Sequence, residues 1–393
     1  MSLYKKMFKY VSLLIMLVII ICLPINVKAY NMDETSAVLS KKVQKIDLKI
    51  PEDATKYVTE KYMEIVEVAL PYYDTLVCDE DEYLLGTPFV IYTPSEYNWN
   101  STYYFPLISN NDIVLLISLI DTNYGWSISA SEEMVDELNL IGYNRDTSWI
   151  FYEQNGNVIA KSPIAEETII ENLYVTDTLE ISMQDDAELT YEEYVDKISE
   201  EMNKINQFNV DAIIESTKGV NVLETYSPGF STSTDTSKIC SLYNAQGQQG
   251  DTCWAASVAT IVNYRKGTNY SDYDVCDKIG VEYAGGTIDD KKTALEEYGL
   301  KYRKSQSQSS WDSIVLNISS KYPLAASTFS GTAGHGVTIY GYRTIGATDY
   351  IVLWNSGMNS GAGATQIVMY NSSGSTFTYS NKTWTWTKTL FYI

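Results

Sequence analysis

The chain has 393 residues, of which 45% are hydrophobic and 20% charged, and its formal net charge at pH 7 is −22. This hydrophobic content is sufficient for buried cores and the length suggests two domains, while the acidic balance argues against a nucleic-acid partner, whose phosphates would be repelled. Residues 1–225 contain 15 Lys or Arg against 38 Asp or Glu, whereas residues 226–393 contain 13 against 12, so a domain boundary is predicted near residue 225.

The first 29 residues have the pattern of an export signal. Three lysines lie among the first nine residues and precede an apolar run, Val11–Leu23, which is shorter than the about 20 residues of a membrane span. A small-residue cleavage pattern ends at Ala29. We therefore expect a signal peptide over residues 1–29, a secreted mature protein and no stable membrane anchor after signal removal. An uncleaved N-terminal anchor is the alternative.

Residues 30–225 are predicted to form an acidic α+β domain preceded by a polar leader. Apolar residues recur with helical spacing over Ala54–Leu70. Runs of strand character follow at Tyr83–Tyr92, Tyr103–Ile108, Ile113–Ile120 and Gly125–Ile128. Asn155-Gly156 indicates a hairpin turn and Tyr191–Ile205 a further helix. The segment has no histidine and no glycine-rich phosphate loop, so it offers no catalytic constellation.

A stretch rich in Ser, Thr, Gly and Pro between Glu215 and Thr236 is typical of an exposed linker that proteases can cut. The second domain, residues 226–393, is predicted to begin with helices and to end with antiparallel strands. The predicted helices are Cys253–Lys266, Ile288–Tyr298 and Trp311–Ser319. The predicted strands are Leu324–Phe329, Gly336–Tyr342, Tyr350–Trp354, Ala364–Tyr370, Thr376–Ser380 and Thr383–Tyr392. This order describes an α+β domain with two lobes.

Four cysteines remain after signal removal, which is few for a disulfide scaffold. They are Cys78, Cys240, Cys253 and Cys276. Outside the cell Cys240 and Cys276 could pair, and the sequence leaves this open. No cysteine pair has zinc-finger spacing and the chain has one histidine, so we expect neither a metal site nor a cofactor.

Cys253, His335 and Asn355 are the candidate catalytic residues. Cys253 is predicted in the first turn of a helix, where free N–H groups and the helix dipole favour thiolate over thiol. His335, the single histidine, lies between two glycines at a strand start and could accept the thiol proton. Asn355 ends a strand and could orient the imidazole, with Asp349 as a rival. Structural roles remain open for each: a buried cysteine, a satisfied histidine and a turn asparagine.

Three glutamines precede the cysteine, and each could donate an amide hydrogen to an oxyanion together with the Cys253 N–H. They are Gln246, Gln248 and Gln249, and composition does not choose between them. If thiol and imidazole form an ion pair, the pKa of His335 in the mature domain should lie well above its unperturbed value of about 6.5.

Residues 240–393 resemble the papain-like cysteine peptidases, and within them the secreted bacterial branch that includes the staphopains. Gln246-Gly247-x-x-Gly250 followed by Cys253-Trp254-Ala255 is similar to the cysteine motif of that family. Gly334–Tyr342 resembles its histidine strand and Asp349–Ser356 its asparagine strand. The resemblance implies a helical lobe followed by a β-barrel-like lobe, and a Gln, Cys, His, Asn order of functional residues with Gln246 as the first.

This sequence departs from the family pattern at two places. The spacing from Gln246 to Cys253 is one residue longer than usual, which leaves the choice between Gln246 and Gln248 open. Gly357-Met358 replaces the tryptophan that normally follows the Asn-Ser pair, so shielding of the His–Asn bond must come from elsewhere, for example Met358 or Trp384.

The resemblance implies a secreted cysteine endopeptidase that is made as a zymogen and acts on proteins or peptides. Residues 30–225 would be its pro-domain and intramolecular inhibitor. Two other functions stay open. One is a thiol acyltransferase of transglutaminase type, which usually requires an aspartate as the third residue. The other is a catalytically inactive, peptidase-like binding protein.

Overall fold

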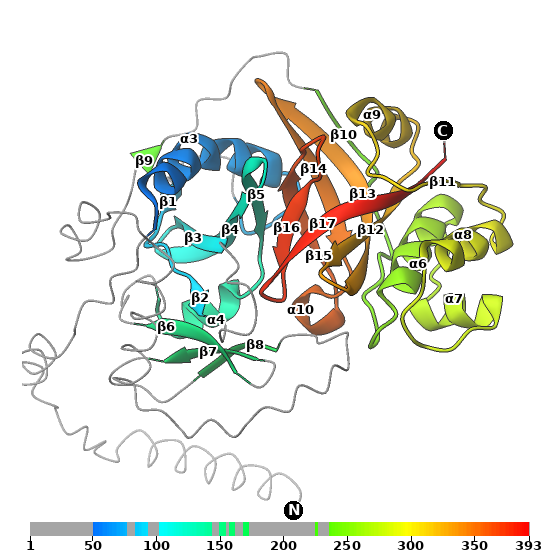
Figure 1. The fold of residues 1–393 in the computed structure, drawn as a ribbon, viewed down its shortest axis with the longest axis horizontal. Coiled ribbons are helices and arrows are strands. Elements are labelled where there is room, and N and C mark those ends of the chain that lie inside the picture. The colour runs from blue at the N-terminus through cyan, green and yellow to red at the C-terminus, as the bar shows by residue number, and fades with distance from the viewer. Residues whose placement is uncertain are drawn as a thin grey trace, which may run out of the picture. The chain divides into compact units, whose positions relative to one another are not determined.

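The computed structural model describes residues 50–76, 83–92, 102–143, 149–154, 157–161, 168–172, 225–226 and 236–392. The predicted signal peptide and leader, Cys78, the Asn155-Gly156 turn, the 191–205 helix and most of the linker lie outside these residues. The described part is an α+β structure with an antiparallel sheet of 13 strands and a smaller sheet of 4 strands (Figure 1). This agrees with the predicted fold class and is compatible with a papain-like domain.

The N-terminal part combines a long helix, a meander of strands and the smaller sheet. Its elements are α3 (Glu52–Ala69), β1 (Tyr83–Leu85), β2 (Ile91–Tyr92), β3 (Thr102–Ser109), β4 (Asp112–Thr122), β5 (Gly125–Ser131), α4 (Val135–Leu140), β6 (Ile150–Gln154), β7 (Asn157–Lys161), β8 (Thr168–Asn172) and β9 (Thr225–Tyr226). Glu52 and Asp53 lie in the first turn of α3, where the positive end of the helix dipole stabilises their carboxylates. Asn110 and Asn111 have φ values of 51° and 68° and form the two-residue turn between β3 and β4.

The C-terminal part places helices before strands. Its elements are β10 (Ser237–Ile239), α6 (Cys253–Lys266), α7 (Asp272–Ile279), α8 (Ile288–Glu297), β11 (Arg303–Ser305), α9 (Trp311–Ser319), β12 (Leu324–Ser330), β13 (Ala333–Ile345), β14 (Thr348–Asn355), α10 (Met358–Gly361), β15 (Ala364–Met369), β16 (Thr376–Tyr379) and β17 (Lys382–Phe391). Capping boxes start α7 at Ser271 and α8 at Thr287, with Asp274 and Asp290 as their acidic partners. The sequence analysis did not predict α7, although Ser271 and Asp274 carry its N-terminal signal.

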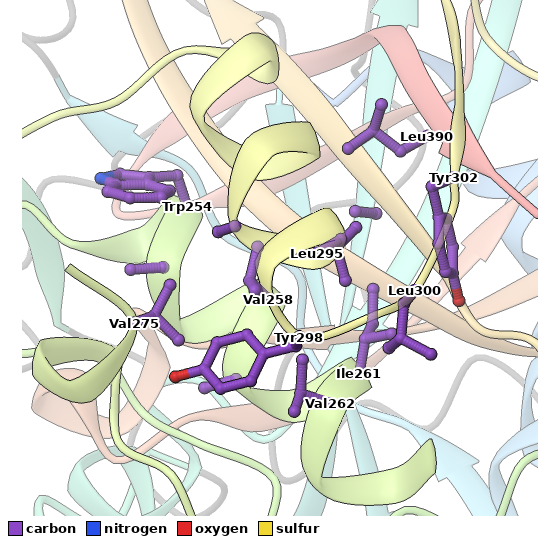
Figure 2. Close-up of a cluster of buried hydrophobic side chains, with 14 of the residues drawn as sticks. Trp254, Val258, Ile261, Val262, Val275, Leu295, Tyr298, Leu300, Tyr302 and Leu390 are labelled. Carbon is purple, nitrogen blue, oxygen red and sulfur yellow. The ribbon is translucent and has the colours of Figure 1, made fainter. Parts of the chain in front are cut away.

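An apolar core joins helices α6, α7 and α8 to the strands β12 and β17, beside which Figure 1 shows them gathered. Figure 2 shows its centre, where Val258 and Ile261 of α6 face Leu295 of α8 and Leu390 of β17. Small side chains allow α6 to sit deep in the protein, and all residues from 253 to 263 are buried. The first turn of α6 is therefore fixed against the sheet.

Strand β13 organises the larger sheet, whose main path is β11-β17-β12-β13-β14-β15-β5-β4-β3-β1-β9; off this path β10 pairs with β13 and β16 with β17. Val337 of β13 stands opposite Asn355 of β14, which brings the end of β14 to the start of β13. Strand β15 pairs with β5 of the N-terminal part, with Gln366 opposite Ser131. The sheet therefore continues across the charge boundary near residue 225.

Cys240, Cys253 and Cys276 are free and buried. The disulfide between Cys240 and Cys276 that the sequence left open is not formed, because Cys276 packs in the α6–α8 core and the Cys240 thiol faces the Ile318 carbonyl at 3.8 Å. Within the described ranges, no helix is long and apolar enough to cross a membrane. The same ranges contain no group of three His, Cys, Asp or Glu placed to hold a metal ion.

Candidate active site

Cys253 is the first residue of α6, and a buried carboxylate holds the loop that leads to it. Asp272, at the start of α7, accepts the backbone N–H of Gln249 at 2.7 Å, its side-chain amide at 3.1 Å and the hydroxyl of Thr252. Asp272 is only 1% exposed, so these bonds replace its lost hydration. Asp272 could not be recognised from sequence, because its partners lie 20 and 23 residues away and no local pattern marks it.

The Cys253 thiol is subject to opposing influences. The backbone N–H of Gly336 donates to Cys253 Sγ at 3.3 Å, and the N-terminus of α6 favours negative charge. Burial is the largest influence on the pKa of Cys253 and raises it, while the ammonium of Lys291 and the N–H of Gly336 lower it. The net direction is upward, so the thiol is protonated at neutral pH in this buried state.

His335 and Asn355 form a direct hydrogen bond between neighbouring strands. His335 Nε2 lies 2.7 Å from Asn355 Oδ1, and Oδ1 also accepts the N–H of Gly357 at 3.2 Å. Asn355 Nδ2 donates to Gln366 Oε1 at 3.4 Å. Because Oδ1 is an acceptor, Nε2 carries the ring hydrogen, and Nδ1 is the atom left to exchange a proton with the thiol.

Asp349, the rival orienting residue, lies near the opposite end of β14. It stands opposite Thr344 of β13 and accepts the Thr344 hydroxyl at 2.8 Å. His335 pairs with Thr328 of β12, beyond the other end of the β13–β14 ladder. The structure therefore brings Asn355, and not Asp349, to the imidazole.

Two rings of the β16–β17 hairpin cover the imidazole. Tyr379 stacks on His335 with a centroid distance of 4.9 Å, and Trp384 lies at 5.3 Å. Of the two shields suggested from sequence, Trp384 is thus in ring contact, whereas Tyr379 was not anticipated. A Cβ at Gly357 would lie 2.1 Å from the Tyr379 hydroxyl, so Tyr379 fills space beside the position where the family has a tryptophan.

The pKa of His335 differs from the sequence-based prediction. Burial lowers it to about 4, the hydrogen bond to Asn355 raises it, and the nearby Lys291 ammonium lowers it. The predicted value well above 6.5 is for the mature domain with a thiolate partner. In the described state His335 is 3% exposed and the thiol is neutral, so no anion compensates for the lost hydration.

The three candidate glutamines have different surroundings. The side chain of Gln246 donates outward, to Asn244 O at 3.0 Å and Asn269 Oδ1 at 3.3 Å. That of Gln249 is bound to Asp272. Gln248 is 3% exposed and lies beside the residue after Asn355, since its Oε1 accepts the Ser356 hydroxyl at 3.2 Å and its N–H donates to Ser356 O at 3.0 Å. The geometry favours Gln248, whose Nε2 donates one hydrogen to Gly250 O at 2.9 Å and keeps a second.

A thiol at a helix N-terminus, bonded by the N–H of the residue that follows an amide-oriented imidazole, fits the arrangement of a cysteine nucleophile site. A family model described as papain-like cysteine protease AvrRpt2 matches residues 233–370, which include Cys253, His335 and Asn355. Residues 233–370 are therefore similar to the papain-like cysteine peptidases. A comparison with curated proteins found no match.

Proposed function

We propose that this protein is a secreted cysteine endopeptidase, made as a zymogen, with Cys253 as nucleophile, His335 as proton-transfer residue and Asn355 as orienting residue. One observation carries the proposal. His335 Nε2 lies 2.7 Å from Asn355 Oδ1, while the N–H of the next residue, Gly336, reaches Cys253 Sγ at 3.3 Å. The family match to residues 233–370 supports the same conclusion, and a staphopain-like organisation with a pro-domain is part of the proposal.

In the proposed reaction the Cys253 proton passes to His335 Nδ1, and the thiolate attacks the carbonyl carbon of the scissile peptide bond. The oxyanion that forms accepts hydrogen bonds from the Cys253 N–H and from Gln248 Nε2. His335 then protonates the leaving amine as the C–N bond breaks, which leaves a thioester on Cys253. Water, deprotonated by His335, hydrolyses the thioester, and the returned proton restores the thiol.

The burial of the site supports an inactive precursor. His335 and Asn355 are 3% and 0% exposed, and burial shifts the pKa values of both thiol and imidazole toward their neutral forms. A site in this state presents neither a thiolate nor a surface for a peptide. Activity therefore requires a change that exposes Cys253 and His335.

Contacts of the N-terminal part suggest how the precursor is kept closed. Glu133 Oε1 accepts the N–H of Ser380 at 3.0 Å, and the Ser127 hydroxyl donates to Thr376 O at 3.1 Å. Ser380 directly follows Tyr379, which stacks on His335. In this proposal residues 30–225 hold the β16–β17 hairpin over the imidazole until the 215–236 linker is cut.

The alternatives predict different chemistry. A transglutaminase-type acyltransferase usually has an aspartate as its third residue, and here Asn355 occupies that place. Such an enzyme would incorporate an amine into a glutamine substrate faster than it hydrolyses peptides. An inactive binding protein would do neither, and its processed form would not react with a thiol-directed epoxide.

The deciding experiment incubates the purified precursor beside its Cys253→Ala variant and maps new N-termini. A new terminus within residues 215–236 in the wild type alone is expected. Epoxide labelling of the processed chain should modify Cys253 and should persist in Cys276→Ala, whose cysteine lies in the core. Absence of both cleavage and labelling contradicts the enzyme. Secretion is tested separately by sequencing the N-terminus of exported protein, which is expected to begin at Tyr30.

A further inference from the structure

Lys291 of α8 is buried beside the candidate nucleophile. The residue is 1% exposed, and its Nζ donates to Ala326 O at 2.7 Å and to Ser327 Oγ at 3.0 Å. A Cβ placed on Gly336 would lie 2.9 Å from Lys291 Nζ and 3.1 Å from Cys253 O. The N–H of the same glycine donates to Cys253 Sγ. The Lys291 ammonium and the Cys253 thiol therefore both lie against Gly336, the residue after His335.

This ammonium has no carboxylate partner among the described residues. Its two hydrogen-bond acceptors are uncharged, although a buried cation is stable only when it is paired or well hydrogen-bonded. Burial lowers the pKa of Lys291 to about 8, so about nine-tenths of the lysine is charged at pH 7. The group that opposes this shift is the Cys253 thiol, which can supply the missing negative charge.

The other charged groups near α8 are engaged elsewhere. On β11, Lys304 pairs with Asp289 at 2.5 Å; on α7, Asp272 holds Gln249 and Thr252; on β17, Lys388 lies over the ring of Phe329 at 5.3 Å. Asp251, before α6, opposes ionisation of the thiol. His335 is repelled by the ammonium when it is protonated. Cys253 and His335 are thus the titratable groups that respond to Lys291.

We propose that Lys291 is a positioning residue that serves as the counter-ion of the Cys253 thiolate. The inference rests on the proposed peptidase function and adds a second cation to its thiol–imidazole pair. When the thiol proton passes to His335 Nδ1, Lys291 keeps its three protons, forms no covalent bond and stabilises the sulfur anion. The same charge disfavours the imidazolium, so Lys291 lowers the pKa values of both groups together.

This predicts a shift of the whole pH profile. In Lys291→Met the loss of the cation raises the thiol pKa and the imidazole pKa, so both limbs of the bell-shaped curve of kcat/KM against pH move to higher pH. Loss of structure alone would lower the curve without moving both limbs upward. Lys291→Arg keeps the charge and should restore the wild-type position of the limbs.

The test measures alkylation of Cys253 by iodoacetamide against pH in the processed two-chain protein, in the wild-type and His335→Ala backgrounds. In His335→Ala, Lys291→Met should raise the midpoint by about one unit, which slows alkylation about tenfold below the midpoint. Lys291→Gln serves if the methionine variant does not fold. Ser327→Ala removes one hydrogen bond of Lys291 but keeps the lysine charge, so the midpoint of Cys253 alkylation should be the same as without this substitution.

Two results would overturn the inference. One is an unchanged midpoint in folded Lys291→Met or Lys291→Gln, and the other is an equally large shift in Ser327→Ala. Failure of the peptidase proposal looks different, because Cys253 would then resist alkylation at every pH in the processed wild type and no peptide would be cleaved. If Cys253 is alkylated rapidly but the pH profile is the same in the Lys291 variants, only the counter-ion role of Lys291 is rejected and the peptidase proposal stands.

Discussion

Replacement of Asn355 by alanine tests the orientation of the imidazole. In the wild type, Asn355 Oδ1 accepts from His335 Nε2 at 2.7 Å and from Gly357 N at 3.2 Å, and the side chain is fully buried. Truncation leaves these two donors without an acceptor in a site that water does not reach. The variant should therefore lose both stability and activity.

The magnitude follows from those two donors. An unsatisfied buried donor costs about 1–3 kcal/mol, so the loss of an acceptor for two donors should lower the free energy of unfolding by about 2–6 kcal/mol. With an unfolding entropy of about 2.1 cal/mol/K per residue, 1 kcal/mol shifts the Tm of a 393-residue chain by about 1.2 °C, so the Tm should fall by about 2–7 °C. A hydrogen bond to a charged group contributes about 1.5–3 kcal/mol, which corresponds to a loss of about 10- to 150-fold in kcat/KM.

The assay compares peptide hydrolysis by processed Asn355→Ala and Asp349→Ala, with calorimetry on both. Asp349 is the matched control, because it lies on the same strand and accepts a hydrogen bond from Thr344 but stands far from His335 along the ladder. Its variant should keep activity within about twofold. Equal losses in the two variants, or full activity in Asn355→Ala despite a lowered Tm, would refute the assignment of Asn355.

Other outcomes follow from the same geometry. Gln248→Ala should lower kcat about 100-fold through loss of an oxyanion donor. Gln246→Ala, which removes an amide that points outward, should change kcat less than about twofold. Steady-state kinetics on the processed protein tests this, and a larger loss in Gln246→Ala would assign the oxyanion role to Gln246. Cleavage of the 215–236 linker should open the Ser127 and Glu133 contacts to the β16–β17 hairpin while the β5–β15 ladder still holds the N-terminal fragment. Both fragments should therefore co-elute in gel filtration, and separation without denaturant would contradict this. The folded-state pKa of His335, about 4, lies below its unfolded value of about 6.5, so the neutral ring contributes stability above pH 6.5 that is lost as pH falls toward 4. Wild-type precursor should lose about 3 kcal/mol more than His335→Ala over this window in urea titrations, and parallel curves would count against the buried imidazole.

Local pattern was sufficient for the elements that carry the site. The predicted helix Cys253–Lys266 has the bounds of α6, because its small and apolar residues are bounded by Thr252 and by Gly267, which adopts the left-handed conformation that ends helices. The predicted strand Tyr350–Trp354 lies within β14, and β-branched and aromatic residues explain its recognition. Helix α7 was missed because it has only eight residues, four of them charged, and its capping residues are its clearest signal.

Two features of the site depend on tertiary contacts and could not be predicted from the local sequence pattern. Three glutamines precede Cys253, and Gln248 is distinguished only by Ser356, which lies 108 residues away. Lys291 lies on the same face of α8 as the buried residues Ile288, Ala294 and Leu295, although lysine is rarely buried. The helical spacing marks this face, but the partners that accept the buried ammonium, on β12, cannot be read from the local sequence.

The charge state of the site is likewise set by distant residues. Cys253 and His335 are far apart in sequence and their chemistry predicts an ion pair, but Tyr379 and Trp384 of the β16–β17 hairpin exclude the water that would stabilise it. Because the Asn355 hydrogen bond and the Gly336 N–H contact are already formed, the proposed activation does not need to assemble the site. It needs to hydrate the site, and displacement of one aromatic hairpin would raise the imidazole pKa and lower the thiol pKa in a single step. A processed form in which those two pKa values stay as they are in the precursor would show that this hairpin is not the control.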